Sequence, residues 1–211
     1  IQIILYVEKI SKIMVISSTN SYSNSNPDVV KLNTLGDTVW INFFGNSGVG
    51  YSEVGQSVKQ TIDGGYIVVG ASYDPAFFNN VLYLLKIDAN GLIEWSKTYL
   101  PSLSISMTGR EVIQNSDGSF MLLAAESTPI GGLRSLLIKT DSQGDTLWTK
   151  TYNEEFFTFY KTIDDGYLFS GNSVVKTDSL GNQQWNYKYV GGGVKAFPKS
   201  KSEEPRISRS L

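Results

Sequence analysis

The sequence predicts an all-β protein, a β-propeller made of four-stranded antiparallel blades, and two recurring motifs support this prediction. The first motif has the form Lys-x-Asp-x-x-Gly-x-x-x-Trp, and the second has the form Thr-x-Asp-Gly-Gly-Tyr. The two motifs alternate in the same order over most of the chain, and no stretch between them has the length and pattern of a helix. Such internal repetition indicates one supersecondary unit that is used several times.

The first motif occurs three times in full and once, near the amino terminus, with Asn33 in place of the aspartate. The last copy follows its predecessor at a shorter interval, which indicates that this unit has lost part of a loop. We interpret the repeated residues as structural, because they return at fixed positions of the unit. They are Lys31, Gly36, Trp40, Lys86, Asp88, Gly91, Trp95, Lys139, Asp141, Gly144, Trp148, Lys176, Asp178, Gly181 and Trp185.

The second motif is clearest at 61–70 and 162–171, and a weaker copy lies at 115–124. Both motifs predict β-hairpins, because each places turn residues between short runs rich in Val, Ile, Leu, Tyr and Trp. In the first motif, the Asp88 side chain can accept hydrogen bonds from the turn amides, and Gly91 supplies the positive φ that the turn requires. The motif carboxylates are therefore explained by folding.

The repeats divide residues 1–190 into a partial blade, three complete blades and one final strand. The first part belongs to a further unit, because 13–17 followed by 29–32 resembles 67–71 followed by 84–87. We expect a partial blade at 1–37, complete blades at 38–91, 92–144 and 145–181, a final strand at 182–190 and a disordered, polar and basic tail at 191–211. The strands of the first complete blade are expected near 38–44, 57–61, 66–72 and 81–88, and those of the second near 92–99, 111–114, 120–126 and 134–141.

The number of units leaves two ways to shield the core. A blade must stack on neighbours, and propellers usually close with four to eight blades. The Trp185 strand can pair with the amino-terminal strands to complete a four-bladed ring, or the chain can be a piece of a larger propeller. We favour the piece, because the chain starts at Ile1 without an initiator Met and its last residues lose the repeat pattern.

The composition bounds the possible functions. With 211 residues, 41% hydrophobic and 12% aromatic, the chain can bury a sizeable core as one repeat domain. Its apolar runs are far shorter than the roughly 20 residues that span a bilayer, so we expect no membrane span. The chain has no Cys and no His, which disfavours thiolate chemistry and the usual general base. The net charge of −2 gives no reason to expect nucleic-acid binding.

Candidate chemical groups all have a structural explanation. The four tryptophans could form ligand platforms, but their fixed place in the repeat predicts packing between blades. The adjacent acids at 154–155 and 164–165 resemble a glycosidase pair only superficially, because neighbours on a strand point to opposite faces and Asp164 holds a turn position. No turn offers enough oxygen ligands for calcium. We therefore predict no catalytic residues, no cofactor and no metal.

The arrangement of the two motifs resembles the tandem repeats of secreted or surface β-propeller proteins of Bacteroidetes-type bacteria, over about residues 13–190. The Asp-x-x-Gly-x-x-x-Trp portion is also similar to the tryptophan-docking motif of quinoprotein-like propellers. The resemblance implies an extracellular or cell-surface location and a structural or binding role. It implies no cofactor site, because quinoprotein dehydrogenases need calcium ligands outside the motif and often a vicinal disulfide, and this chain has no Cys.

The sequence thus favours a non-catalytic binding or scaffold module whose unrepeated rim loops contact a protein or glycan. One alternative is a carbohydrate-active or quinoprotein-like propeller enzyme, which would need two unrepeated carboxylates that converge. Another is an inactive fragment of a larger propeller, which would associate through open blade edges. The candidate rim contacts are Tyr73, Phe77 and Phe78, with Arg134 just beyond the last of these loops.

Overall fold

The computed structural model describes residues 2–7, 13–18, 27–44, 52–75, 79–100 and 106–188. These residues form sixteen strands and no helix, and the strands belong to four separate antiparallel sheets of four consecutive strands each. We number the sheets blade 1 to blade 4 in chain order. The all-β prediction, with four-stranded antiparallel blades of a propeller, is confirmed.

Every blade is a simple meander in which each strand pairs with the next. Blade 1 contains β1 (Gln2–Val7), β2 (Ile13–Ser18), β3 (Pro27–Leu32) and β4 (Thr38–Phe43). Blade 2 contains β5 (Ser52–Gln60), β6 (Tyr66–Asp74), β7 (Asn79–Ile87) and β8 (Ile93–Tyr99). Blade 3 contains β9 (Ser106–Gln114), β10 (Phe120–Ser127), β11 (Leu133–Thr140) and β12 (Thr146–Tyr152). Blade 4 contains β13 (Phe156–Lys161), β14 (Tyr167–Gly171), β15 (Ser173–Thr177) and β16 (Gln183–Lys188).

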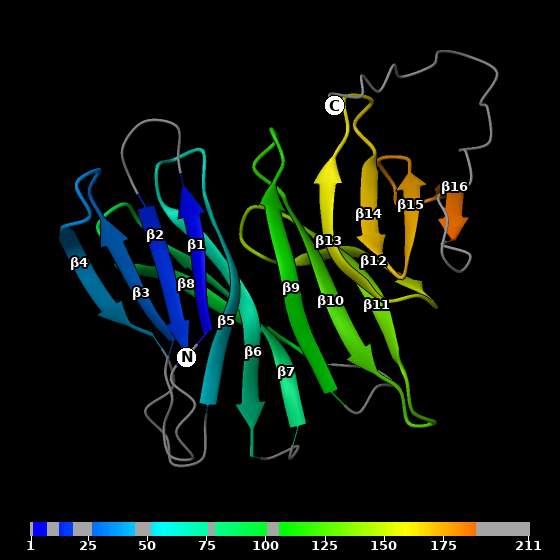
Figure 1. The fold of residues 1–211 in the computed structure, drawn as a ribbon, viewed down its shortest axis with the longest axis horizontal. Helices are drawn as coiled ribbons and strands as arrows, with labels where there is room; N and C mark the ends of the chain where they lie inside the picture. Colours follow the sequence, from blue (N-terminus) through cyan, green and yellow to red (C-terminus); the bar gives the residue numbers. More distant parts are fainter. Residues whose placement is uncertain are drawn as a thin grey trace, which may run out of the picture.

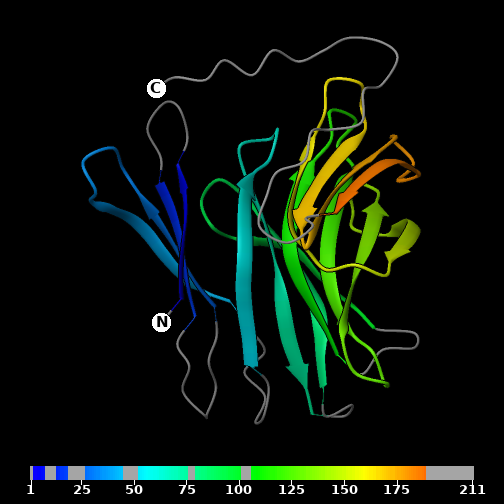
Figure 2. The same cartoon turned by 45° about the vertical axis from the view of Figure 1, so that its right-hand side comes forward.

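The blades stand side by side in chain order, with blade 1 and blade 4 at opposite ends of the row (Figures 1 and 2). The first strand of each blade faces its neighbours, since β9 contacts both β5 and β13. The described strands of blade 1 and blade 4 do not pair with one another. The described chain is therefore an open arc of blades, and it does not close a four-bladed ring in this structure.

The sheets divide the chain differently from the expected units. The sequence-based division started a unit at each tryptophan strand, whereas in the structure that strand is the fourth of its sheet. The cause is the Asp-x-x-Gly turn, a hairpin turn that ties the tryptophan strand to the lysine strand before it, as in the pairs Lys86–Trp95 and Lys139–Trp148. Blade 1 is accordingly a whole sheet. The expected tail at 191–211 lies outside the described residues.

The glycines of the first motif adopt the conformation expected for them. Gly36, Gly91, Gly144 and Gly181 have φ between 74° and 88°, in the region that side chains with a Cβ rarely occupy. In each turn the motif aspartate or asparagine also lies two residues before an amide that donates to it; Asp88 Oδ1, for example, accepts from the amides of Asn90 and Leu92 at 2.8 Å. The turn prediction is therefore confirmed.

Three apolar clusters fill the spaces between neighbouring blades. Between blades 2 and 3 the cluster is largely aliphatic, with Leu84 and Leu122 fully buried. Between blades 3 and 4 it is largely aromatic, with Phe159 and Phe169 at its centre. Trp40, Trp95 and Trp148 each pack against one of the three clusters. The core thus lies between the sheets, where alternate residues of the strands face each other.

Candidate binding surface

In blades 2 and 4, the repeated lysine links the two motifs of the same blade. Lys86 on β7 is 3% exposed, and its Nζ lies 2.9 Å from Asp63 Oδ2 and 2.7 Å from Glu94 Oε2. In blade 4, Lys176 Nζ lies 2.8 Å from Asp164 Oδ2 and donates to the Thr177 carbonyl at 2.7 Å. The lysine of the first motif therefore neutralises the aspartate of the second motif, a link that the sequence-based interpretation missed.

These contacts hold the turn carboxylates in the ionised form. Burial alone would raise the pKa of Asp63, but hydrogen bonds from Thr61 and Lys86 outweigh it and lower the pKa to about 2. The ammonium of Lys176, followed by the hydroxyl of Thr162, lowers the pKa of Asp164 as well. A carboxylate with such a low pKa is a poor general base near neutral pH. The arrangement favours a structural role for both aspartates.

The joints between neighbouring blades use the first motif a second time. Tyr99 at the end of β8 donates its hydroxyl to the Gly144 carbonyl at 2.7 Å, and Tyr152 at the end of β12 donates to the Gly181 carbonyl at 2.6 Å. Burial, reinforced by nearby turn aspartates, raises the pKa of both tyrosines above the usual value. Both hydroxyls thus stay protonated and serve as fixed donors that hold one blade against the next.

The first strands of blades 2, 3 and 4 meet at one carboxylate. Glu111 on β9 accepts hydrogen bonds from Ser57 on β5 at 2.7 Å and from Thr158 on β13 at 3.2 Å, and it pairs with Lys59 at 3.0 Å. All of these partners belong to neighbouring blades. Glu111 therefore joins three blades, and its partners leave it little freedom to act on a ligand.

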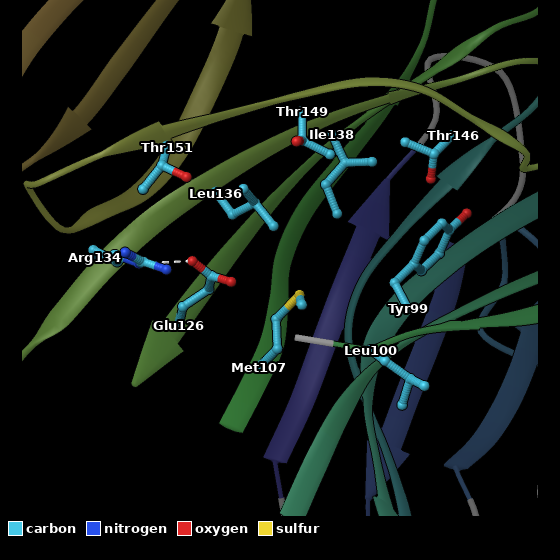
Figure 3. Close-up of a pocket in the computed structure, with 10 residues that line it drawn as sticks. All are labelled: Tyr99, Leu100, Met107, Glu126, Arg134, Leu136, Ile138, Thr146, Thr149 and Thr151. Atoms are coloured by element: carbon cyan, nitrogen blue, oxygen red, sulfur yellow. Dashed lines mark hydrogen bonds and ion pairs between the residues drawn. The ribbon is translucent and has the colours of Figure 1, made fainter. Parts of the chain in front are cut away.

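An open pocket of about 390 Å³ lies between blades 2 and 3 (Figure 3). We call it the interblade pocket. Its floor is apolar, formed by Met107, Leu136 and Ile138, which are all buried. Its other lining residues carry hydroxyl or charged groups, apart from the exposed Leu100; they are Tyr99, Leu100, Glu126, Arg134, Thr146, Thr149 and Thr151.

One ion pair marks an end of this pocket. Glu126 on β10 and Arg134 on β11 face each other across the hairpin, and Arg134 Nε donates to Glu126 Oε2 at 2.8 Å. Figure 3 shows this pair and Thr151 on one side of the pocket, and Tyr99 with Thr146 on the other. The Glu126 side chain is 3% exposed, whereas that of Arg134 is 25% exposed. The guanidinium is thus the part of the pair that a ligand can reach.

The predicted rim contacts fall in different places. Tyr73 lies near the end of β6 and is half-buried, whereas Phe77 and Phe78 lie outside the described residues. Arg134 lines the interblade pocket. A contact role for these four residues stays a prediction. The pocket itself was not predicted, because its lining comes from two blades whose pairing depends on contacts distant in the sequence.

The described residues contain neither a candidate metal centre nor a membrane-spanning helix. Among them, no group of three or more His, Cys, Asp or Glu side chains is arranged to hold a metal ion. No helix long and apolar enough to cross a membrane is found in that part of the chain. What the described fold and pocket define is a set of propeller-type blades with a small amphipathic pocket between two of them.

No protein-family model matches the chain, and no curated protein matches it. Among solved structures, the chain is similar to the crystal structure of BamB from Moraxella catarrhalis, with 12% sequence identity and a TM-score of 0.42. The alignment covers 85% of this chain and 62% of the BamB chain, so this chain spans less than two thirds of BamB. At this identity and TM-score, we transfer neither partners nor activity from BamB.

Proposed function

We propose that this chain is a non-catalytic binding or scaffold module, and that the interblade pocket is where it contacts a protein or glycan partner. The observation that carries the proposal is that the motif residues and the pocket-lining residues are different residues. The repeated lysines and turn aspartates contact each other or the turns, whereas none of the fifteen repeated residues of the first motif lines the pocket. Unrepeated residues on a repeated scaffold are where binding specificity is expected.

The lining favours a protein segment over a glycan. The apolar floor of Met107, Leu136 and Ile138 suits one apolar side chain, and the hydroxyls of Thr149 and Thr151 can bond the backbone of an extended segment. Arg134 can pair with a carboxylate of the partner. The volume of about 390 Å³ lies at the lower end of the range for ligand sites.

The enzyme alternative is less well supported by the pocket. A glycosidase needs two carboxylates that flank the scissile bond. Among the described residues that line the pocket, Glu126 is the single carboxylate, and it is already paired with Arg134. An extracellular or cell-surface location stays a prediction that rests on the resemblance of the repeats.

The test is a binding screen with a matched pair of variants. The wild-type chain is applied to an array of bacterial surface proteins and to an array of glycans. The same arrays are then probed with two variants: Thr151→Arg, whose long side chain fills the pocket, and Thr98→Arg. Thr98 is the equivalent exposed position of blade 2, three residues after Trp95 as Thr151 follows Trp148, and it does not line the pocket. We expect binding to a surface protein that Thr151→Arg abolishes and Thr98→Arg preserves.

Three results would count against the proposal. Absence of binding on both arrays would refute the binding module. Binding that both variants preserve would place the contact outside the pocket. Turnover of an array glycan that Glu126→Gln abolishes would establish the enzyme instead.

A further inference from the structure

The three joints between neighbouring blades have one geometry, and among the described residues each half of this joint is also present, without a partner blade, at one end of the arc. In a joint, the outer strand of one blade docks onto the Asp-x-x-Gly turn of the next. Gly91, Gly144 and Gly181 are the turn glycines of the three joints, and all three are buried. The corresponding residue of blade 1, Gly36, is exposed.

The docking surface comes so close that only glycine fits. A Cβ placed on Gly91 would lie 3.0 Å from Cζ3 of Trp40, and one placed on Gly144 would lie 2.9 Å from Cζ3 of Trp95. In the third joint the nearest atom to such a Cβ on Gly181 is the Tyr152 hydroxyl, at 3.1 Å. The motif glycine is thus required for blade packing as well as for its positive φ.

Polar contacts complete each joint. The carbonyl of the turn glycine accepts a hydrogen bond from the preceding blade, from Asn42 at Gly91 (2.8 Å) and from Tyr99 at Gly144 (2.7 Å). Two residues after the tryptophan, Lys97 forms an ion pair with Asp145 of the next turn. The joint is therefore a specific contact between the aromatic outer strand of one blade and the turn of the next.

Blade 1 presents the turn half of this joint, and the conformation of the turn is already formed. Gly36 has φ 88°, and the Asn33 Oδ1 atom accepts hydrogen bonds from the amides of Leu35 and Asp37 at 2.9 and 2.8 Å. Among the described residues, no atom lies within 4 Å of a Cβ placed on Gly36. The turn at 33–37 also carries Asp37 at the position of Asp145.

Blade 4 presents the other half. Trp185 pairs with Lys176 across β15 and β16, as Trp95 pairs with Lys86 across β7 and β8. Trp185 is exposed, at 37%, whereas the tryptophans of the other three blades are partly buried against a cluster. The two unpartnered halves lie at opposite ends of the arc, so they do not meet within one described chain (Figure 1).

We propose that the Trp185 face of blade 4 binds the turn at 33–37 of blade 1 in a second copy of this chain. The interface is head to tail, and a head-to-tail contact forms a closed ring when the rotation between copies allows it. Two copies with four blades each would close a ring of eight, which lies within the usual range for propellers. The two ends carry the parts that meet at the three joints inside the chain, a tryptophan on the outer strand and a turn with a glycine, although Tyr187 replaces the lysine that follows the tryptophan in the second joint.

The experiment measures the solution mass of the purified chain by light scattering during size-exclusion chromatography, over a range of concentrations. We expect a particle of twice the chain mass of 23.3 kDa. Quenching of tryptophan fluorescence by acrylamide gives a second readout that needs no variant. As dilution splits the dimer, Trp185 becomes more accessible, and quenching rises together with the loss of mass.

Two glycine variants with similar backbone strain test the role of the turn. Gly36→Lys blocks the proposed dock, and Gly131→Lys is its control. Both glycines have a positive φ, 88° and 84°, and neither has a described atom near its Cβ position, but Gly131 lies in the hairpin between β10 and β11. We expect Gly36→Lys to weaken dimerisation by about tenfold or more and Gly131→Lys to leave it unchanged.

Mixing two variants tests the head-to-tail arrangement. Trp185→Ala keeps the turn, and Gly36→Lys keeps the aromatic face, so a mixture of the two restores one intact interface. At a concentration just above the one at which the wild-type dimer dissociates, we expect each variant alone to be mainly monomeric and the mixture to contain dimers. A monomeric wild-type chain, polydisperse aggregates, or equal dimerisation of Gly36→Lys and Gly131→Lys would each overturn the proposal.

Discussion

Blade 2 and blade 4 have the same turn chemistry but different strands. Each carries the Thr-Ile-Asp turn, and in each the lysine of the third strand reaches the aspartate of that turn, at 2.9 Å for Lys86 and 2.8 Å for Lys176. The first three strands of blade 2 have nine residues each, whereas those of blade 4 have six, five and five. The turns, and not the strand lengths, are what the repeat preserves.

The side chains that fill the two blades also differ. Val68 in β6 and Phe169 in β14 hold equivalent positions in the second motif, and both are fully buried. Phe169 stacks on Phe159 with centroids 5.6 Å apart and 20° between the rings, and it also contacts Phe156 at 5.2 Å. Short strands offer fewer inward positions, so large rings supply the buried area that blade 2 obtains from more numerous aliphatic residues.

Removal of the central side chain should show the largest difference between the two blades. We expect Phe169→Ala to lower the free energy of unfolding by about 3–5 kcal/mol, since it removes a ring on which four aromatic neighbours pack. Val68→Ala removes two carbon atoms and should cost about 2 kcal/mol. Urea unfolding followed by circular dichroism measures both. Equal costs would mean that blade 4 does not depend on its aromatic cluster.

The lysine networks should give a smaller difference, because their carboxylates are partly exposed. Lys86 faces two carboxylates, those of Asp63 and Glu94, whereas the equivalent partner of Lys176 is the neutral Gln184. Lys86→Met leaves both carboxylates close together without a cation, and we expect a loss of about 1–2 kcal/mol. Lys176→Met leaves one carboxylate, and the expected loss is about 1 kcal/mol or less.

Glu94→Gln is the matched control for this pair, because it gives Lys86 the partner set of Lys176. In this background, the cost of Lys86→Met should fall to that of Lys176→Met. The measurement is again the unfolding free energy at neutral pH. If Glu94→Gln leaves the cost of Lys86→Met unchanged, the second carboxylate is not the source of the difference.

The sequence was sufficient to predict the local features of this fold. The Asp-x-x-Gly turns, the strands around them and the all-β class depend on short stretches of chain, and these predictions are confirmed. The division into sheets differed, because a hairpin pattern shows which strands are neighbours and does not show where one sheet ends. The hairpin of Lys86 and Trp95 has the same appearance in either division.

The candidate site depends on contacts that a single sequence does not specify. Lys86 and Asp63 recur in a fixed order, and that recurrence was a usable signal for their ion pair. The interblade pocket had no such signal. Tyr99 and Thr149 line it from different blades, and their proximity depends on how one sheet packs against the next. The geometry of that packing comes from buried side chains such as Leu84 and Leu122, whose exact fit is not encoded by any motif.

The smallest predicted effect concerns the acid sensitivity that the two blades share. The pKa of Asp63 is lowered to about 2 in the folded protein, below the unfolded value of about 3.9, so its contacts stabilise the fold fully above about pH 4. This contribution is lost as the pH falls through the folded pKa, between about pH 4 and pH 2. Because Asp63 is half exposed, solvent screening limits the contribution to about 1 kcal/mol or less.

We therefore expect Asp63→Asn to be less stable than the wild-type chain at neutral pH, and the difference to vanish as the pH approaches 2. Asp164→Asn in blade 4 should show the same sign, because the ammonium of Lys176 lowers the pKa of Asp164 too. Unfolding by urea at a series of pH values from 7 to 2 measures both variants. A difference that does not change with pH would mean that Asp63→Asn acts through the neutral hydrogen bonds of the turn, and that the lysine contributes nothing through its charge.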